Sequence, residues 1–159
     1  MKMELSSLTL SDLTPSQFCV SRSKLVAVER WFDPADLSRF SPIPVKYLDG
    51  RFVMTDGHTR AVAALRAGLE RVPLVWDEDE LDWDLYRLDV LACRARGVFS
   101  PADLASRVLS DADYAIRWDA WCDRLQNEVE VARKSGLRSL DAILPTLTCL
   151  GDSHEDPCE

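Results

Sequence analysis

The segment TDGHTRAVAALRAG, at residues 55–68, places a group of polar side chains directly before an alanine-rich helix. The candidate functional residues in this segment are Asp56, Gly57, His58, Thr59 and Arg60. The first backbone N–H groups of a helix lack partners within the helix, and the helix dipole adds positive potential at the same end. Because both features attract anions, the segment predicts a phosphate-binding site at the start of the helix.

The residues of this turn differ in what they can contribute. Gly57 lets a ligand approach the backbone closely, Thr59 offers a hydroxyl donor, and His58 lies between them. Arg60 can direct a planar fork of N–H donors at phosphate oxygens. Asp56 repels a phosphate unless it binds a cation or accepts a proton from a substrate, so it is a candidate catalytic residue.

A purely structural interpretation of the same residues is also open. Asp56 is then the N-cap of the helix, His58 a half-exposed surface residue, and Arg60 the partner of a nearby acid. The pattern D-G-H-x-R is short, so the residue types alone do not decide between the two interpretations.

The surrounding sequence predicts the elements that position this turn. Asp49-Gly50 separates two stretches with alternating faces, which is typical of a β-hairpin, and Gly68 is suited to end the alanine-rich helix. The expected elements are a strand at 5–10, a helix at 24–32, a hairpin at 43–55, a helix at 59–67 and a strand at 72–76.

The second half of the chain predicts helices. After the acidic run at 77–80, helices are expected at 82–96, from Ser100 and from Ser110. The last of them carries an apolar stripe of Tyr114, Trp118, Trp121, Leu125 and Val129. The expected organisation is a domain at 1–78, a helical extension packed on it at 79–135, and a poorly ordered tail at 136–159.

Charge is distributed unevenly along the 159 residues, whose net charge is −8. Residues 1–76 contain ten Lys and Arg against eight Asp and Glu, whereas residues 77–159 contain nine against nineteen. Because affinity for duplex DNA comes largely from neutralised phosphates, duplex DNA is not an expected partner.

Composition also limits the class of protein. The sequence has no run of 18 apolar residues and no signal-peptide pattern, so a cytoplasmic protein without membrane contact is expected. The five cysteines are scattered and form no C-x-x-C pair, which indicates neither a disulfide framework nor a zinc site.

Two segments resemble the ParB/sulfiredoxin superfamily. They are LTLSDLTPSQF and PIPVKYLDGRFVMTDGHTRAVAALRAGLERVPLVW, in which a hairpin leads into a G-x-x-R turn and an Ala-rich helix. The resemblance covers residues 4–76. It implies an α/β fold with a small mixed sheet, a β-hairpin and flanking helices, followed here by the α-helical C-terminal extension.

The resemblance also implies a ligand. Members of the superfamily bind nucleotides: partition proteins bind and hydrolyse CTP, sulfiredoxins use ATP, and a free serine kinase branch transfers a nucleotide's phosphate. A nucleotide, ATP or CTP, is therefore expected at Gly57–Arg60, with Mg²⁺ as an optional companion. The helix that contains Glu29 borders the nucleotide site in this superfamily, so Glu29 is a second candidate general base; the alternative is a solvated glutamate.

The sequence departs from the superfamily at two places. His58 replaces the reactive cysteine of sulfiredoxins, so repair of cysteine-sulfinic acid is not expected. Residues 100–122 could form two helices joined by a turn, as in a DNA-reading module, but Leu109 occupies the usual glycine position and the second helix lacks base-reading side chains. Covering the sheet or making a homodimer contact is the preferred alternative role for this segment.

Two hypotheses for function follow. As an enzyme, the protein would hydrolyse a nucleoside triphosphate or transfer its terminal phosphate to a small hydroxyl acceptor, with Asp56 or Glu29 taking the proton. As a binding or regulatory module, it would use the same pocket without turnover. The acidic run at 77–80 could contribute to a magnesium site or could be a solvated turn before the next helix.

Overall fold

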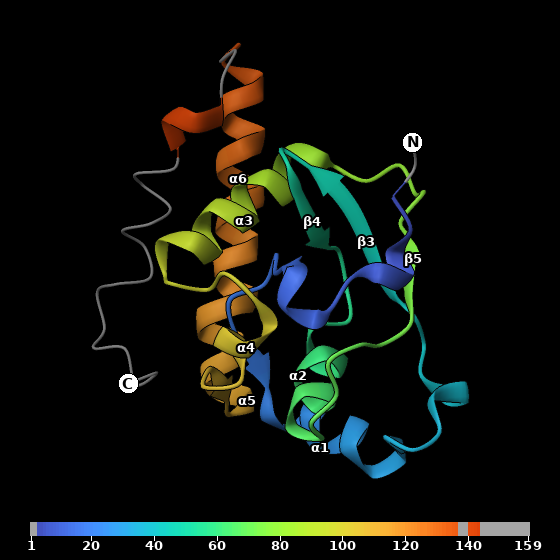
Figure 1. Cartoon of the computed structure of the whole chain (residues 1–159). Helices are drawn as coiled ribbons and strands as arrows, with labels where there is room; N and C mark the ends of the chain where they lie inside the picture. Colours follow the sequence, from blue (N-terminus) through green and yellow to red (C-terminus); the bar gives the residue numbers. More distant parts are fainter. Residues whose placement is uncertain (1–2, 137–139, 144–159) are drawn as a thin grey trace.

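The computed structural model describes residues 3–136 and 140–143 of the chain, and it shows a mixed α/β fold with a small sheet and flanking helices (Figure 1). The main sheet has four strands in the order β1-β4-β3-β5. Their bounds are β1 Leu13–Thr14, β3 Ile43–Leu48, β4 Arg51–Met54 and β5 Leu74–Trp76. Strands β3 and β4 are antiparallel, whereas β1 is parallel to β4 and β5 is parallel to β3. The α/β class predicted from the sequence is confirmed.

The β3–β4 hairpin turns at the predicted Asp-Gly pair. Asp49 and Gly50 both have positive φ, at 50° and 80°, as a two-residue hairpin turn with right-handed strand twist requires. The turn delivers β4 to its end at Met54, three residues before the left-handed Gly57. The hairpin therefore fixes where the next helix begins.

The prediction of a strand at residues 5–10 is wrong. Two short 3₁₀ helices, η1 Leu5–Ser7 and η2 Leu10–Asp12, occupy this region, and the chain becomes extended only in β1. The Asp12 carboxylate accepts hydrogen bonds from the Thr9 backbone N–H and hydroxyl at 2.8 and 2.9 Å. This local capping competes with strand pairing, which the apolar alternation alone did not reveal.

Two helices cover opposite faces of the main sheet. Helix α2, His58–Arg66, packs Ala61 and Ala64 into a core with Ile43, Val45 and Met54. Helix α3, Trp83–Ala95, places Val90 against Leu48 and Val53 on the other face. The small side chains of α2 let it lie close to the strands, and the result is a helix–sheet–helix arrangement.

The other helices surround a second core that joins the two halves of the chain. A two-stranded parallel sheet pairs β2, Val20–Ser21, with β6, Val108–Leu109. The remaining elements are α1 Arg22–Trp31, η3 Leu37–Arg39, α4 Pro101–Leu104, α5 Asp111–Tyr114, the π-helical turn η4 Ala115–Asp119, α6 Ala120–Lys134 and η5 Leu140–Ile143. Leu25 of α1, Val62 of α2 and Trp121 of α6 share this core.

The predicted apolar stripe faces this second core. Tyr114, Trp121, Leu125 and Val129 are buried and Trp118 packs against them. Phe18 meets the Trp118 and Trp121 rings edge-on at centroid distances of 4.9 and 5.1 Å. Most of the segment at 136–159, for which a poorly ordered tail is expected, lies outside the described residues.

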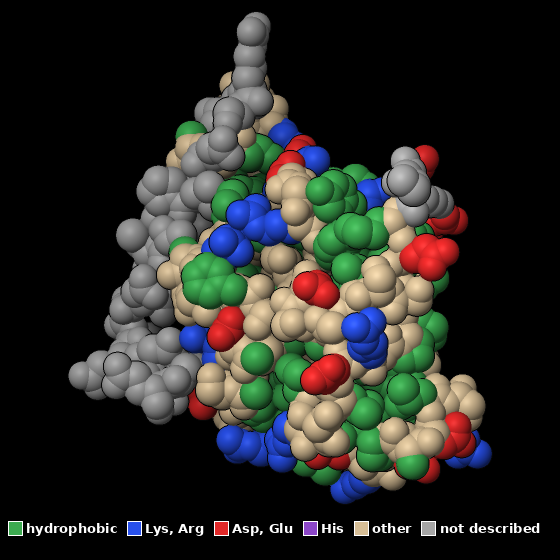
Figure 2. All heavy atoms as spheres, in the orientation of Figure 1, with side chains coloured by type: hydrophobic (Ala, Val, Ile, Leu, Met, Phe, Trp, Pro, Cys, Tyr) green, Lys and Arg blue, Asp and Glu red, His purple; other side chains and the backbone are tan. Residues whose placement is uncertain are grey.

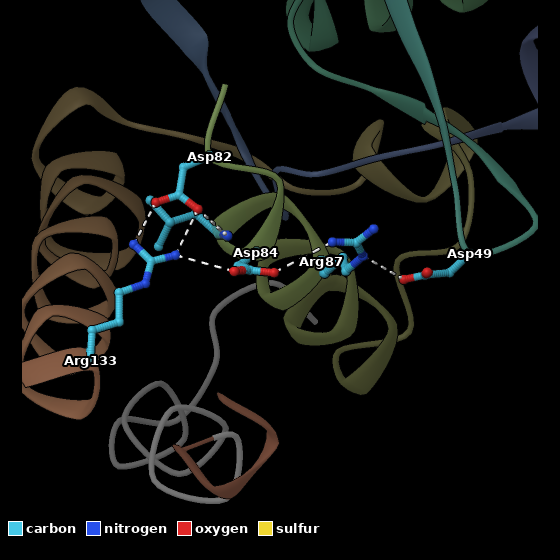
Figure 3. Close-up of polar contacts among 6 residues, drawn as sticks. Asp49, Asp82, Asp84, Arg87 and Arg133 are labelled. Atoms are coloured by element: carbon cyan, nitrogen blue, oxygen red, sulfur yellow. Dashed lines mark hydrogen bonds and ion pairs between the residues drawn. The ribbon is translucent and has the colours of Figure 1, made fainter. Parts of the chain in front are cut away.

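A chain of ion pairs connects the hairpin, α3 and α6 (Figure 3). Arg133 of α6 donates to Asp82, the N-cap of α3, at 2.8 and 2.9 Å, and to Asp84 at 3.3 Å. Arg87 of α3 then pairs with Asp84 at 3.4 Å and with Asp49 in the hairpin turn at 3.1 Å. These contacts tie the first turns of α3 to α6 and to the hairpin turn, which joins the end of β3 to the start of β4.

Within the described part of the chain, no helix combines the length and the apolar character needed to cross a membrane.

Candidate functional site

The start of α2 is shaped by Gly57, not by an acidic N-cap. Gly57 is the N-cap residue, with φ 79°, and no side chain caps the helix. The Asp56 carboxylate accepts a hydrogen bond from the Gly57 backbone N–H at 2.7 Å and lies outside the helix. The interpretation of Asp56 as the N-cap is therefore wrong, and its exposed side chain stays beside the helix entrance.

The backbone N–H groups at this entrance have no partner among the described residues. The Gly57 carbonyl accepts the first helical hydrogen bond, from the Ala61 N–H at 3.0 Å. Among the described residues, no hydrogen bond reaches the backbone N–H groups of His58, Thr59 or Arg60, and none reaches the Thr59 hydroxyl. Several donors and the positive end of the helix dipole therefore converge there.

The Arg60 side chain folds back over Gly57. A Cβ atom added at Gly57 would lie 2.7 Å from Arg60 Nη2, 3.3 Å from Arg60 Nε and 3.1 Å from Ile43 Cγ1. Gly57 is thus needed for its positive φ and for the space that the guanidinium occupies. Arg60 Nε is shielded from solvent and has no hydrogen-bond partner, and no acid of the described chain forms an ion pair with Arg60.

His58 is buried, with only 4% of its surface exposed, so the interpretation as a half-exposed residue is wrong. Its Nε2 atom accepts a hydrogen bond from the Ser16 backbone N–H at 3.0 Å. Burial lowers the pKa of His58 to about 4; Asp56 opposes this shift and Arg60 adds to it. The imidazole ring is therefore neutral at neutral pH. The backbone N–H of His58 lies at the helix entrance, while its side chain binds the loop that contains Ser16.

That second loop contains a site neighbour that the sequence reasoning missed. Ser16 is 3% exposed, and its hydroxyl donates to the Met54 carbonyl at 2.6 Å. The next residue, Gln17, donates to the Tyr114 hydroxyl at 3.1 Å, and Arg107 Nε donates to the Phe18 carbonyl at 2.7 Å. The partners lie 38, 97 and 89 positions away in the sequence, so no local pattern predicts these contacts.

A pocket of about 530 Å³ lies beside the entrance, at the ends of β4 and β5. Its lining consists of Pro44, Thr55, Asp56, Val75, Trp76, Asp77, Glu78, Asp79, Leu81 and Tyr86. The Thr55 hydroxyl donates to Asp77 at 2.6 Å, and the Tyr86 hydroxyl donates to the Thr55 carbonyl at 3.3 Å. The lining contains acids but neither lysine nor arginine, so the pocket has negative potential directly next to the donor-rich helix start.

The predicted acidic run contributes to this pocket through Asp77, Glu78 and Asp79. In the part of the chain that the structure describes, no group of three or more His, Cys, Asp or Glu side chains is arranged to hold a metal ion. Magnesium commonly binds through one or two carboxylates plus phosphate oxygens. Asp56 and Asp77 both line the pocket, and Mg²⁺ as an optional companion of the ligand stays a prediction.

Glu29 does not join the other predicted site residues. It is exposed on α1 and pairs with Arg66 of α2 at 3.7 Å. Arg66 ends α2, eight residues after His58, so it lies about 12 Å from the helix start at the rise of an α-helix. The structure therefore places Glu29 beside the opposite end of α2.

The segment at 100–122 differs from the helix pair that the sequence indicated. Helix α4 is one turn long, and strand β6 separates it from α5. Tyr114 and Trp121 are buried in the core, whereas Asp113 of α5 and Asp119 of η4 are exposed. The side chains that a recognition helix would direct at DNA bases are here aromatic residues of the core or exposed acids.

Comparisons with known proteins add little to this geometry. No protein-family model and no curated protein matches the sequence. Protein Atu1540 from Agrobacterium tumefaciens has a crystal structure that resembles the chain with a TM-score of 0.40 and 16% sequence identity, over 92% of this chain and 90% of that one. A similarity of this size supports no statement about function.

Proposed function

We propose that this chain is a ParB-like phosphate-binding protein whose ligand site is the start of α2. The observation that carries the proposal is the position of Arg60. Its guanidinium lies over Gly57 with Nε shielded from water and unpaired, next to the backbone donors of residues 58–60. A shielded donor without a partner is costly, and a phosphate at this place would satisfy it.

The ligand that we propose is a nucleotide, ATP or CTP. The support for this step is the resemblance of residues 4–76 to the ParB/sulfiredoxin superfamily, together with the order of hairpin, glycine turn and Ala-rich helix. The pocket beside Asp56 leaves room for a further part of the ligand or for a second substrate.

A titration with nucleotides tests this proposal. We expect ATP or CTP to raise the melting temperature, since a ligand at 100 times its Kd adds about 2.7 kcal/mol of stability. Arg60→Gln should weaken binding by about 1.5 to 3 kcal/mol, the worth of a charge-assisted hydrogen bond. Arg66→Gln is the matched control, because it removes an arginine from the same helix at the end that faces Glu29. Equal affinity of the two variants would contradict the proposed site.

A second candidate function is phosphate transfer or nucleotide hydrolysis, and one observation favours it. Asp56 lines the pocket and also borders the start of α2, where a carboxylate opposes an anion. Such a placement is useful if the carboxylate takes a proton from a water or hydroxyl acceptor in the pocket, or if it binds a cation. The alternative is a binding module that uses the same site without turnover.

Asp56→Asn separates the two candidates. The amide keeps the shape of the turn but cannot accept a proton, so we expect turnover to be lost while nucleotide affinity is kept or increased. Calorimetry and phosphate release should be measured on both proteins. Absence of turnover in the unmodified protein, with hydroxyl acceptors present, would favour the binding module.

A further inference from the structure

The pocket beside Asp56 has four carboxylates and no base in its lining. They belong to Asp56, Asp77, Glu78 and Asp79, and among the described residues no ion pair joins any of them to a lysine or arginine. Acidic and basic side chains occur together over the face of the molecule drawn in Figure 2, so a lining with acids alone differs from that surface. The unneutralised charge attracts a positively charged ligand into the pocket.

Contacts within the chain hold part of this lining in place. One oxygen of the Asp77 carboxylate accepts a hydrogen bond from the Thr55 hydroxyl at 2.6 Å, and the other accepts one from the Asp79 backbone N–H at 3.0 Å. Each oxygen keeps a further acceptor site for a ligand. The Tyr86 hydroxyl donates to the Thr55 carbonyl at 3.3 Å. The Asp77 carboxylate and the Tyr86 ring therefore need little ordering when a ligand binds, which lowers the free-energy cost of binding.

The remaining lining suits an organic cation better than a metal ion. Apolar and aromatic surface is supplied by Pro44, Val75, Trp76, Leu81 and Tyr86, and the volume of about 530 Å³ lies in the range of pockets for small molecules. An aromatic ring attracts an ammonium group over its face, and apolar surface binds the carbon chain beside that group. A metal ion uses neither, and in the described part of the chain no three His, Cys, Asp or Glu side chains are arranged to hold one.

We propose that this pocket binds a small aliphatic amino alcohol in its ammonium form. The ammonium group lies among the carboxylates, and the carbon chain contacts the apolar wall. A free amino acid is a poorer ligand, because the lining offers its carboxylate neither lysine nor arginine. The carboxylates and the apolar wall are both present without a nucleotide, so binding of the amino alcohol does not require the phosphate site.

The position of the pocket gives this ligand a role that rests on the proposed function. Asp56 lines the pocket and borders the start of α2. The hydroxyl oxygen of a bound amino alcohol would bond to the terminal phosphorus of the nucleotide as the bond to the leaving nucleoside diphosphate breaks, and its proton would pass to Asp56. The positive charge of this acceptor would also reduce the repulsion between the carboxylates and the phosphates.

Calorimetry on the full chain, without nucleotide or magnesium, tests the binding. We expect ethanolamine to bind, and ethylene glycol not to bind because it lacks the ammonium group. Serine should bind about tenfold more weakly or worse, because its carboxylate is repelled by the lining. Serine binding as tightly as ethanolamine would overturn the proposal, and so would an absence of ethanolamine binding at millimolar concentration. Since none of these titrations contains a nucleotide, their outcome is separate from that of Arg60→Gln.

Matched variants locate the binding. Asp77→Asn/Asp79→Asn removes two charges from the pocket, while the amide at position 77 keeps an oxygen for the Thr55 hydroxyl, and it should weaken ethanolamine binding about tenfold or more. Asp79→Asn alone leaves the Asp77 carboxylate in place and should weaken binding less. Asp113→Asn/Asp123→Asn is the control, because both aspartates are exposed on α5 and α6 and lie outside the lining. Equal affinity of the two double variants, or displacement of ethanolamine by magnesium chloride but not by sodium chloride of equal ionic strength, would contradict the proposal.

Discussion

At the start of α2, backbone conformation and burial determine what Gly57 and His58 can contribute to a site. Gly57 supplies a positive φ and an open position for the Arg60 guanidinium. The sequence indicates His58 as a candidate phosphate-binding residue, but its side chain is buried and accepts a hydrogen bond from the Ser16 backbone N–H. Motif and residue type therefore pointed to residues 56–60 but not to Ser16, and burial decides where the His58 side chain lies.

The two roles of Gly57 can be separated with a matched glycine. Gly50 has a φ of 80°, nearly the same as Gly57, yet a Cβ atom there would meet nothing within 4 Å. Both Gly57→Ala and Gly50→Ala should lower the free energy of unfolding by about 1 kcal/mol or more through backbone strain. Only Gly57→Ala should also displace Arg60 and weaken nucleotide affinity, about tenfold or more by calorimetry. Equal affinity of the two variants would show that Arg60 does not need this space.

His58 should make the fold sensitive to acid. Its pKa is lowered from 6.5 to about 4 by burial, so below pH 6.5 the unfolded chain takes up a proton that the folded protein excludes. The free energy of unfolding should fall between pH 6.5 and 4 by up to roughly 3 kcal/mol. Urea titrations at pH 7 and 5 measure the loss. His58→Gln keeps an acceptor without a titrating ring and should lose less; an equal loss in both would contradict this explanation.

At the scale of elements, the hairpin, α2 and α3 could be predicted from the sequence because their signals are local. Alternation on both sides of Asp49-Gly50 and the glycines after each helix are sufficient for them. The β2–β6 pair could not be predicted, since two residues of each strand carry no periodicity and their partners lie 88 positions apart. The contacts of Ser16 with β4 and α2 escaped prediction for the same reason.

Helix α3 contains a carboxylate, that of Asp89, with a shielded oxygen that has no hydrogen-bond partner. Asp89 Oδ1 is shielded from solvent and has no hydrogen-bond partner, and burial raises the pKa of Asp89. Above pH 3.8 the Asp89 carboxyl ionises in the unfolded chain but stays protonated to a higher pH in the folded protein. The free energy of unfolding therefore falls as the pH rises from that value. Asp89→Asn should raise the free energy of unfolding at pH 8 by about 1 to 3 kcal/mol.

The pH profile provides the check on Asp89. The advantage of Asp89→Asn over the unmodified protein should shrink as the pH falls below 3.8, where the carboxyl is protonated in both the unfolded and the folded state. Asp123→Asn is a suitable control, because Asp123 is exposed on α6. A variant that is less stable than the unmodified protein at pH 8 would show that the carboxylate has a favourable role.

At the scale of the whole molecule, the two halves differ in charge but share one core. The aromatic side chains of Tyr114, Trp118 and Trp121 in the second half lie in the same core as residues of α1 and α2. Because the Ser16–Phe18 loop is held by His58 on one side and by Tyr114 and Arg107 on the other, the proposed ligand site contacts a loop that both halves of the chain hold in place. Neither composition nor motif predicted this dependence, since it arises from contacts between distant segments.

The shared core also has a consequence for how the chain is made. Leu25 and Val62 emerge early in synthesis, but Trp121, Leu125 and Val129, which cover the same core, follow roughly 60 residues later. At about 5 to 20 residues per second, the ribosome leaves the first half without its cover for several seconds. During that interval, apolar surface that is buried in the finished protein is open to chaperones and to neighbouring chains. Packing of the helical half is therefore expected to be the last step of folding, and the site proposed to bind phosphate would be complete only after that step.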